Sequence, residues 1–486
     1  MEKQKSLKLN FIMNAMLTMS SFIFPLITFP YVSRILLPIG TGKVSFATSV
    51  VSYFALLARL GIPTYGIHAC ARVRDNKAQL SRTVQEIFII NVIMSVIAYI
   101  LFAILLSIVP KLREERMLLI IISTSIVFNA IGMEWLYKAL EQYTYITIRS
   151  IIFKIVALMA MFLLIHEQND YVIYGGITIF ASSASNIFNL LNIHKFVDIK
   201  PVGEYEFNKH LKAIAVFFAM SCATTIYTNL DTVMLGFIIN DEAVGYYNAA
   251  VKIKTILVSI ITSFGTVLLP RASYYIEHNL MDDFYKITRK AINFVIVVAL
   301  PTILYFTIYA KEGIFFLSGS AYAGAIIPMQ IIMPTLLVVG LTNVMGIQML
   351  IPLRKEKIVL YSEIAGAIVN LLINFWLIPI FASVGAAIGT LVAEIVVWIV
   401  QYCSLKNDIT KAYKNVKYNS VIAATATGCL ISFWIKLLHL DNFLTLLFSS
   451  ILFFGSYTLV LVLTKETIAY EIIRQVNIWL SAKMKK

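Results

Sequence analysis

Charged side chains inside long apolar runs are the residues of this sequence whose chemistry has to be explained first. Inside these runs or at their edges lie six basic and four acidic residues: Arg34, Arg59, Arg149, Lys154, Lys252 and Lys254, and Glu134, Asp231, Glu363 and Glu394. A basic side chain near the centre of a lipid bilayer costs roughly 2.5–3.5 kcal/mol on insertion scales, so a position that faces lipid is unfavourable. We therefore expect these groups to face water or one another, and the basic excess favours a cavity that attracts an anion.

Four of the basic residues are our candidates for anion binding: Arg34, Arg59, Lys154 and Lys252. Lys252 and Lys254 are two positions apart, which is about 200° around a helix, so they cannot share one face, and of the two we favour Lys252. Arg34 could equally be an interfacial residue whose charged end snorkels to water. Arg59 and Lys154 could instead form local ion pairs or anchor helix ends at the cytoplasmic side.

The acidic candidates are Asp231 and Glu394, and each has two interpretations. A carboxylate inside a membrane helix either takes part in proton or cation coupling or pairs with a basic neighbour. Glu394 follows small residues at 385–389, a pattern typical of close helix packing. Glu134 and Glu363 lie near expected helix ends and are expected to be solvated or paired.

The composition indicates an all-α polytopic membrane protein. Of the 486 residues, 59% are hydrophobic and only 14% are charged, whereas a soluble domain is about 25% charged. The mean hydropathy is +0.82. The net charge of +14 comes from basic residues in short loops between apolar runs, where topology signals belong, so we do not expect nucleic acid as a partner. Four widely spaced cysteines form neither a disulfide framework nor a zinc motif.

Apolar runs long enough to cross about 30 Å of hydrocarbon, roughly 20 residues each, predict about fourteen transmembrane helices. The expected spans are 9–32, 43–62, 84–109, 117–137, 147–165, 171–193, 212–238, 244–268, 290–310, 323–350, 358–379, 383–404, 419–438 and 443–463. The first run follows three lysines but lacks a small-residue cleavage site, so we interpret it as a retained helix.

The distribution of lysine and arginine predicts that both termini face the cytoplasm. Alternate loops are basic, with Lys and Arg concentrated at 72–82, 195–212, 271–290, 354–357 and 406–417. The intervening loops offer little beyond Lys111, Arg113, Arg116 and Lys311. Because basic loops stay inside, this asymmetry sets the orientation, and an even number of helices agrees with it.

An internal repeat predicts the architecture. Residues 9–75 run as a helix, the phrase SRILLPIGTGKVSFA, a second helix and GIPTYG, and residues 212–279 run as a helix, DTVMLGFIINDEAVGYYNAA, a second helix and GTVLLPRASYY. Two repeats of the same orientation indicate two six-helix lobes with pseudo-twofold symmetry around a central cavity. The expected parts are an N-terminal lobe, a cytoplasmic linker, a C-terminal lobe, helices 13 and 14, and a cytoplasmic tail: 1–193, 194–211, 212–404, 405–463 and 464–486.

The stretch Gly40-Thr41-Gly42-Lys43 is similar to a phosphate-binding loop but lacks its defining residues. A Walker A motif needs glycine five positions before the Gly-Lys pair and Ser or Thr after the lysine, where this chain has Leu37 and Val44. Nucleotide binding is therefore rejected. We expect Gly40 and Gly42 to form a turn between the first two helices, with Pro38 helping to stop the first.

The quoted residues also resemble a known family. The segment from FPLITFPYVSRILLPIGTGKVSFA through GIPTYGIHACARVRDN, with EWLYKALEQYTYITIRSI at 134–151 and LDTVMLG at 230–236, is similar to the Wzx-type flippases of lipid-linked polysaccharide repeat units. That family shares a superfamily with multidrug and toxin extruders and the lipid II flippase. The resemblance implies transport of an undecaprenyl-pyrophosphate-linked oligosaccharide across a bacterial plasma membrane to its outer leaflet, in a capsule, O-antigen or exopolysaccharide pathway, together with polysaccharide polymerase machinery.

Two other function classes remain as alternatives. A multidrug or cation antiporter of the same superfamily would need an acidic or aromatic cavity, because basic residues repel cationic drugs. A membrane polymerase would be expected to carry a large outer loop with catalytic residues, and the outer connections here are short. HExxH, GxSxG and metal-ligand clusters do not occur in the sequence, so we expect a transporter rather than an enzyme, without cofactor or metal.

Overall fold

The computed structural model of the protein describes residues 7–413, 418–467, 470 and 474. The chain divides into two compact units, Met1–Gly245 and Tyr246–Lys486. Within the described residues the regular structure is helical and no strand occurs, which confirms the all-α class. The expected lobe boundaries stay a prediction, and most of the expected tail at 464–486 lies outside the described residues.

Among the described residues, ten helices are long and apolar enough to cross a membrane, or eleven if the bent pair Ser320–Ile332 and Thr335–Leu350 forms one span. A multi-pass membrane protein is therefore confirmed. The count of fourteen and the symmetry of two lobes stay predictions. The lower number arises partly because Leu9–Val73 is counted as one candidate span and because the apolar helix Arg116–Gly132 is short.

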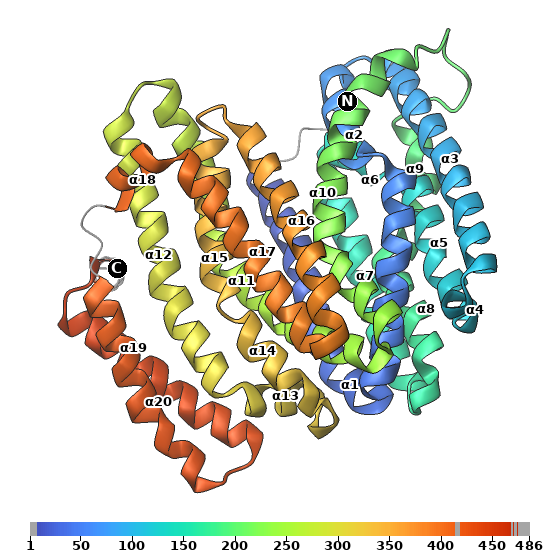
Figure 1. Ribbon diagram of the computed structural model, residues 1–486. Helices are drawn as coiled ribbons and strands as arrows, with labels where there is room; N and C mark the ends of the chain where they lie inside the picture. The colour runs from blue at the N-terminus through green and yellow to red at the C-terminus, as the bar shows by residue number, and fades with distance from the viewer. Residues whose placement is uncertain (1–6, 414–417, 468–469, 471–473, 475–486) are drawn as a thin grey trace, which may run out of the picture. The chain divides into compact units, whose positions relative to one another are not determined.

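The first unit holds the elements that form the candidate site (Figure 1). They are α1 (Leu7–Arg59), α2 (Ile62–Val73), α3 (Lys77–Ile108), α4 (Pro110–Glu114), α5 (Arg116–Gly132), α6 (Glu134–Ala139), α7 (Tyr143–Leu164), α8 (Tyr171–Ser183), α9 (Ile187–Asn192), α10 (Asn208–Ile238) and the first residues of α11 (Asp241–Glu277). Short 3-10 turns lie between α7 and α10, at Gln168–Asp170, Ala184–Asn186 and Ile193–Lys195.

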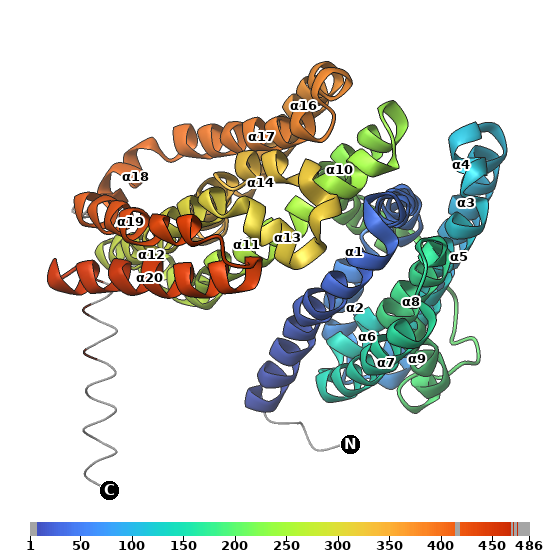
Figure 2. The ribbon, with the colours of Figure 1, turned by 90° about the horizontal axis from the view of Figure 1, so that it is seen from below.

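The second unit continues along α11 and contains the remaining helices. They are α12 (Met281–Ile308), α13 (Ala310–Ser318), α14 (Ile326–Ile332), α15 (Thr335–Asn343), the π-helix η5 (Val344–Leu350), α16 (Glu356–Phe381), α17 (Ser383–Ser404), α18 (Lys406–Tyr413), α19 (Tyr418–Phe433) and α20 (Asn442–Leu463), with 3-10 turns at Ser320–Ala325 and Trp434–Leu438. Figures 1 and 2 both show α16 beside α17 and α19 beside α20.

Close packing of α16 against α17 depends on two glycines of α17. A Cβ added to Gly385 would lie 2.4 Å from the backbone oxygen of Leu377, and one added to Gly389 would lie 2.1 Å from Oδ1 of Asn374. At Gly385 the obstructing atom belongs to the backbone, so only a residue without a side chain fits there. The packing role expected for residues 385–389 is therefore confirmed.

The long helix α1 folds back on itself at Leu37, whose φ and ψ of 58° and 179° are not helical. The two limbs of α1 meet at its lower end in Figure 1. The expected turn at Gly40 and Gly42 is wrong, because both glycines lie in the helical second limb. The break precedes Pro38 because proline disfavours the α conformation of the residue before it, whereas proline itself fits the first turn of a helix.

Gly42 serves instead for close approach between α1 and the start of α11, where its counterpart is Gly245. A Cβ on Gly42 would lie 1.7 Å from the backbone oxygen of Asp241, and a Cβ on Gly245 would lie 2.1 Å from the backbone oxygen of Pro38. Each glycine thus meets the residue four positions before the other glycine. We call this reciprocal contact of Gly42, Gly245, Pro38 and Asp241 the glycine crossing.

Two ion pairs flank the glycine crossing, and both use residues at or next to α4. Lys43 lies 2.5 Å from Glu115, and Lys111 lies 3.0 Å from Asp241. All four side chains are less than one third exposed. The segment around α4 therefore ties the start of the second limb of α1 to the start of α11.

A fully buried carboxylate on α3, that of Glu86, anchors the charged segment that leads into α10. Its Oε1 accepts hydrogen bonds from Nε of Arg82 at 3.1 Å and from the backbone N–H of Glu206 at 2.7 Å. Its Oε2 lies 2.9 Å from Nζ of Lys209 and 2.7 Å from Nε2 of His210. This cluster fixes the N-terminal end of α10, which carries one wall of the candidate site.

Candidate functional site

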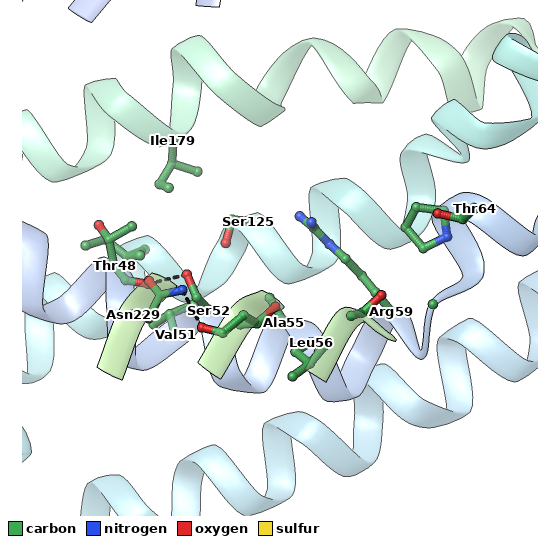
Figure 3. Close-up of a pocket in the computed structure, with 15 residues that line it drawn as sticks. Thr48, Val51, Ser52, Ala55, Leu56, Arg59, Thr64, Ser125, Ile179 and Asn229 are labelled. Carbon is green, nitrogen blue, oxygen red and sulfur yellow. Dashed lines mark hydrogen bonds between the residues drawn. The ribbon is translucent and has the colours of Figure 1, made fainter. Parts of the chain in front are cut away.

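A cavity of about 390 Å³ lies among α1, α2, α5, α8 and α10 of the first unit (Figure 3). Its volume falls within the range of roughly 300–1,000 Å³ that is usual for ligand sites. The lining combines apolar side chains with hydroxyl and amide groups and a single arginine: Thr48, Val51, Ser52, Ala55, Leu56, Arg59, Gly61, Pro63, Thr64, Ile122, Ser125, Ile179, Ser221, Thr225 and Asn229. We call this space the large cavity.

The polar groups of the large cavity follow the helical repeat. On α10 they occur at Ser221, Thr225 and Asn229, and on α1 Ser52 follows Thr48 by four positions. Residues four apart lie on the same face of a helix, so each set forms a stripe along one wall. These stripes were visible in the sequence as hydroxyl residues at regular spacing within apolar helices, and our sequence interpretation missed them.

Arg59 is the last residue of α1 and reaches the large cavity because it continues the face of that helix that carries Ser52, Ala55 and Leu56. The helix breaks directly after Arg59. Leu60 and Gly61 both adopt left-handed conformations, with φ of 44° and 72°. A Cβ on Gly61 would lie 2.5 Å from the backbone of Phe217, so glycine is required both for the conformation and for the contact with α10. In Figure 3 the side chain of Arg59 extends from α1 into the cavity, toward Ser125.

A second space of about 160 Å³ adjoins Arg59 and is called the small cavity here. Besides Arg59 it is lined by Ile62, Pro63, Asn91, Asn129, Glu134, Trp135 and Lys138. Arg59 therefore borders both cavities. A ligand group bound by this guanidinium could extend into either space.

Three charged residues line the small cavity, and one of them, Glu134, interacts with a wider set of basic groups. Glu134 lies 2.8 Å from Lys138 and also interacts electrostatically with Arg59, Arg149 and Lys154. Four basic groups and one carboxylate give these five residues a net charge of +3. We call them the basic cluster, and they make this part of the first unit attractive to an anion.

Two of the predicted anion-binding residues belong to the basic cluster, namely Arg59 and Lys154. Lys154, on α7, donates to the hydroxyl oxygens of Ser20 and Ser21 on α1 at 2.8 and 3.0 Å. Arg34 is exposed on the first limb of α1, donates to the backbone oxygen of Pro30 at 2.6 Å, and does not line either cavity.

The other predicted site residues lie elsewhere in the fold. Asp231 is buried in α10 of the first unit, with 4% of its surface exposed. Lys252 is half-buried on α11 in the second unit. Glu394, buried in α17 of the same unit, lies 3.8 Å from Lys254, so the ion-pair interpretation of this carboxylate has a partner in the structure.

The sequence interpretation did not consider Lys138, expected Glu134 only to be solvated or paired, and gave Arg149 no role in the site. Glu134 and Lys138 stand four positions apart, a spacing that predicts a helical ion pair and was available as a signal. Arg149 is buried and donates to the backbone oxygen of Ser185 at 2.6 Å and to Oδ1 of Asn186 at 3.2 Å. Within the described residues no three His, Cys, Asp or Glu side chains are placed to hold a metal ion.

Comparisons with known proteins agree with this architecture. A family model described as "Polysaccharide biosynthesis protein" matches residues 7–276. A protein of Escherichia coli (strain K12) named "Putative O-antigen transporter" is 25% identical over 413 residues, which cover 83% of this chain and 97% of that protein. The family resemblance expected from the N-terminal segment is confirmed.

Two solved structures share the fold. The lipid II flippase MurJ in an inward closed conformation aligns with a TM-score of 0.70 and 15% identity, over 93% of this chain and 98% of that chain. A multidrug resistance MATE family transporter of the MOP superfamily, in an inward-facing conformation, aligns with a TM-score of 0.61 and 14% identity, over 82% and 99%. At these identities the likeness supports the fold alone.

Proposed function

Because the chain belongs to the polysaccharide biosynthesis protein family, we propose that it is a flippase for lipid-linked oligosaccharides. Its substrate is an undecaprenyl-pyrophosphate-linked polysaccharide repeat unit, which it moves from the cytoplasmic to the outer leaflet of a bacterial plasma membrane. Both termini then face the cytoplasm. The observation that carries the proposal is the net charge of +3 around Arg59, beside a cavity lined with hydroxyl groups.

The basic cluster suits the pyrophosphate. A pyrophosphate diester carries about two negative charges, and Arg59 offers the planar donor fork that binds phosphate oxygens in pairs. The first turn of α2, at Pro63 and Thr64, lines the same cavity, so the positive end of that helix adds to the attraction. The other basic residues of the cluster offset part of the free energy needed to remove the anion from water.

The hydroxyl stripes suit the sugars. Sugars are rich in hydroxyl groups that lose their hydrogen bonds to water inside a membrane, and the stripes on α1 and α10 replace some of those bonds. The polyprenyl tail remains in the lipid, so the protein needs no apolar site for it. Transport needs no covalent step, because alternating access moves the same molecule from one side to the other.

The membrane potential supplies a driving force for an anion that leaves the cell. Moving one elementary charge across 100 mV is worth about 2.3 kcal/mol, so two charges gain roughly 4–5 kcal/mol when the inside is negative. If basic groups travel with the substrate, the potential acts on the return of the empty carrier instead. Asp231 and Glu394 are then our candidates for proton or sodium coupling, and Lys252 is a further candidate for anion binding in the second unit.

A flipping assay tests the proposal. Purified protein in proteoliposomes is given a lipid-linked oligosaccharide, and the fraction that reaches the opposite leaflet is measured for Arg59→Ala, Lys154→Ala, Lys252→Ala and the triple variant. We expect the triple variant to lose flipping while it still inserts, and Arg59→Lys to lose less than Arg59→Ala. Lys195→Ala, which removes an exposed charge outside both cavities, is the matched control. Normal flipping by the triple variant would refute a cationic binding site.

The same preparation tests the alternative of a multidrug or cation antiporter. A net charge of +3 beside the large cavity repels cationic drugs, so we expect no uptake of such compounds by the wild-type protein. Cation uptake that rises in Arg59→Ala, without any flipping of the lipid-linked oligosaccharide, would favour the antiporter instead.

A further inference from the structure

We infer that the small cavity is a binding subsite for one neutral sugar ring, the one attached directly to the pyrophosphate. The subsite rests on the proposed function and specifies which sugar of the substrate the protein recognises. Arg59 borders both the large and the small cavity. A pyrophosphate held by Arg59 leaves its attached sugar within reach of the small cavity.

The size of the small cavity favours a single ring. Its volume of about 160 Å³ is close to the roughly 150 Å³ of a protein cavity that holds one benzene ring. The space therefore suits one six-membered ring rather than a chain of several sugars. The rest of the oligosaccharide would then occupy the large cavity or the water beyond it.

The polar groups of the small cavity match sugar hydroxyls. Asn91 and Asn129 each use Nδ2 to donate to a backbone oxygen, of Ala58 at 2.7 Å and of Ser125 at 2.6 Å. Among the described residues neither Oδ1 atom accepts a hydrogen bond, so both amides can accept from a ligand. Hydroxyl groups are the donors that such acceptors require.

The ion pair of Glu134 and Lys138 completes the set. The two charged groups lie 2.8 Å apart, and each side chain is about one third exposed. A carboxylate accepts from one sugar hydroxyl while an ammonium donates to the oxygen of the next, so the pair can hold two neighbouring hydroxyls. A pyrophosphate held by Arg59 offsets the charge of that guanidinium, and the ion pair of Glu134 and Lys138 carries no net charge, so we assign a neutral ring.

Trp135 gives the subsite a rigid apolar wall. It lines the small cavity although only 5% of its surface is exposed. A Cβ on Gly66 would lie 2.7 Å from the indole ring, so α2 holds this side chain firmly in place. The C–H face of a sugar can pack against such an aromatic surface while its hydroxyls reach the polar groups.

The test compares two lipids. Binding to the full-length protein in nanodiscs is measured for undecaprenyl pyrophosphate and for undecaprenyl-pyrophosphate-linked N-acetylglucosamine, a neutral sugar. We expect the wild-type protein to prefer the sugar-bearing lipid about tenfold, as hydrogen bonds to charged groups would give. The double variant Glu134→Gln/Lys138→Met removes one charge of each sign, so the net charge of the cluster is kept, and its preference should fall to about one.

The outcomes separate the subsite from the proposed function. A wild-type protein that binds both lipids equally, or a double variant that keeps the full preference, would overturn the subsite. A double variant that loses affinity for both lipids to the same extent would do so as well, because the pair would then act only on the pyrophosphate. Failure of the proposed function looks different, since Arg59→Ala would then leave the affinity for bare undecaprenyl pyrophosphate unchanged.

Discussion

The glycine crossing makes a quantitative prediction for Gly42→Ala. The added Cβ would lie 1.7 Å from the backbone oxygen of Asp241, whereas ordinary van der Waals contact begins at about 3.4 Å, so the helices must separate by about 1.7 Å. The obstructing atom belongs to the backbone and cannot rotate away. Overpacking of this kind costs about 1–3 kcal/mol, while replacing a helical glycine by alanine gains about 0.5–1 kcal/mol. Because this overlap is extreme, we expect a net loss of about 2 kcal/mol in the free energy of unfolding.

The assay is thermal unfolding of the purified variants in one detergent. Gly245→Ala should be less severe than Gly42→Ala, because its Cβ would meet the oxygen of Pro38 at 2.1 Å rather than 1.7 Å. Gly455→Ala in α20 is the matched control, since its Cβ would have no neighbour within 4 Å and the substitution should be neutral or slightly stabilising. If Gly42→Ala unfolds at the same temperature as Gly455→Ala, the close approach at the crossing is refuted.

Three further predictions concern stability, topology and energy coupling. Replacing Glu86 by Ala leaves the buried His210 ring without its acceptor, whereas Arg82 and Lys209 still reach solvent. The change should cost about 1–3 kcal/mol in thermal or denaturant unfolding, with Glu86→Gln milder; unchanged stability would contradict the anchoring role. In a cysteine-free background, an impermeant maleimide added to sealed cells should label Gln168→Cys but not Asp75→Cys, both exposed positions, and the reverse pattern would invert the orientation. Flipping at fixed pH and sodium should speed up with an inside-negative potential; indifference to potential, with loss of flipping in Asp231→Asn or Glu394→Gln, would indicate cation coupling instead.

The fold class was predictable from the sequence because hydropathy and charge act over whole helices. The break of α1 was expected close to its true place, but it was assigned to Gly40 and Gly42 instead of Leu37. A glycine suits both a turn and a close helix contact, and only the approach of α11 decides between the two. Such an approach depends on residues some 200 positions away, which a local pattern does not contain.

The candidate site was predictable only in part, for a related reason. Arg34 and Arg59 look alike in the sequence, since each is a lone arginine in an apolar run. Arg59 continues the face of α1 that lines the large cavity, whereas Arg34 folds onto the backbone oxygen of Pro30. The basic excess pointed to an anion, but which groups share one space follows from tertiary packing. Glu134 shows this best, because its neighbours come from α1, α6 and α7.

The hydroxyl stripes have a consequence for how the large cavity treats different sugars. Thr48, Ser52 and Ser221 each donate their hydroxyl proton to a backbone oxygen one turn earlier in their own helix, at 2.7, 2.8 and 2.9 Å. These hydroxyl protons are therefore already engaged in hydrogen bonds. The three groups can offer a substrate in the cavity mainly their acceptor lone pairs. Lone pairs accept from a hydroxyl over a broad range of angles. We therefore expect the large cavity to discriminate little between sugar stereoisomers. One transporter would then accept repeat units that differ in the sugars beyond the first.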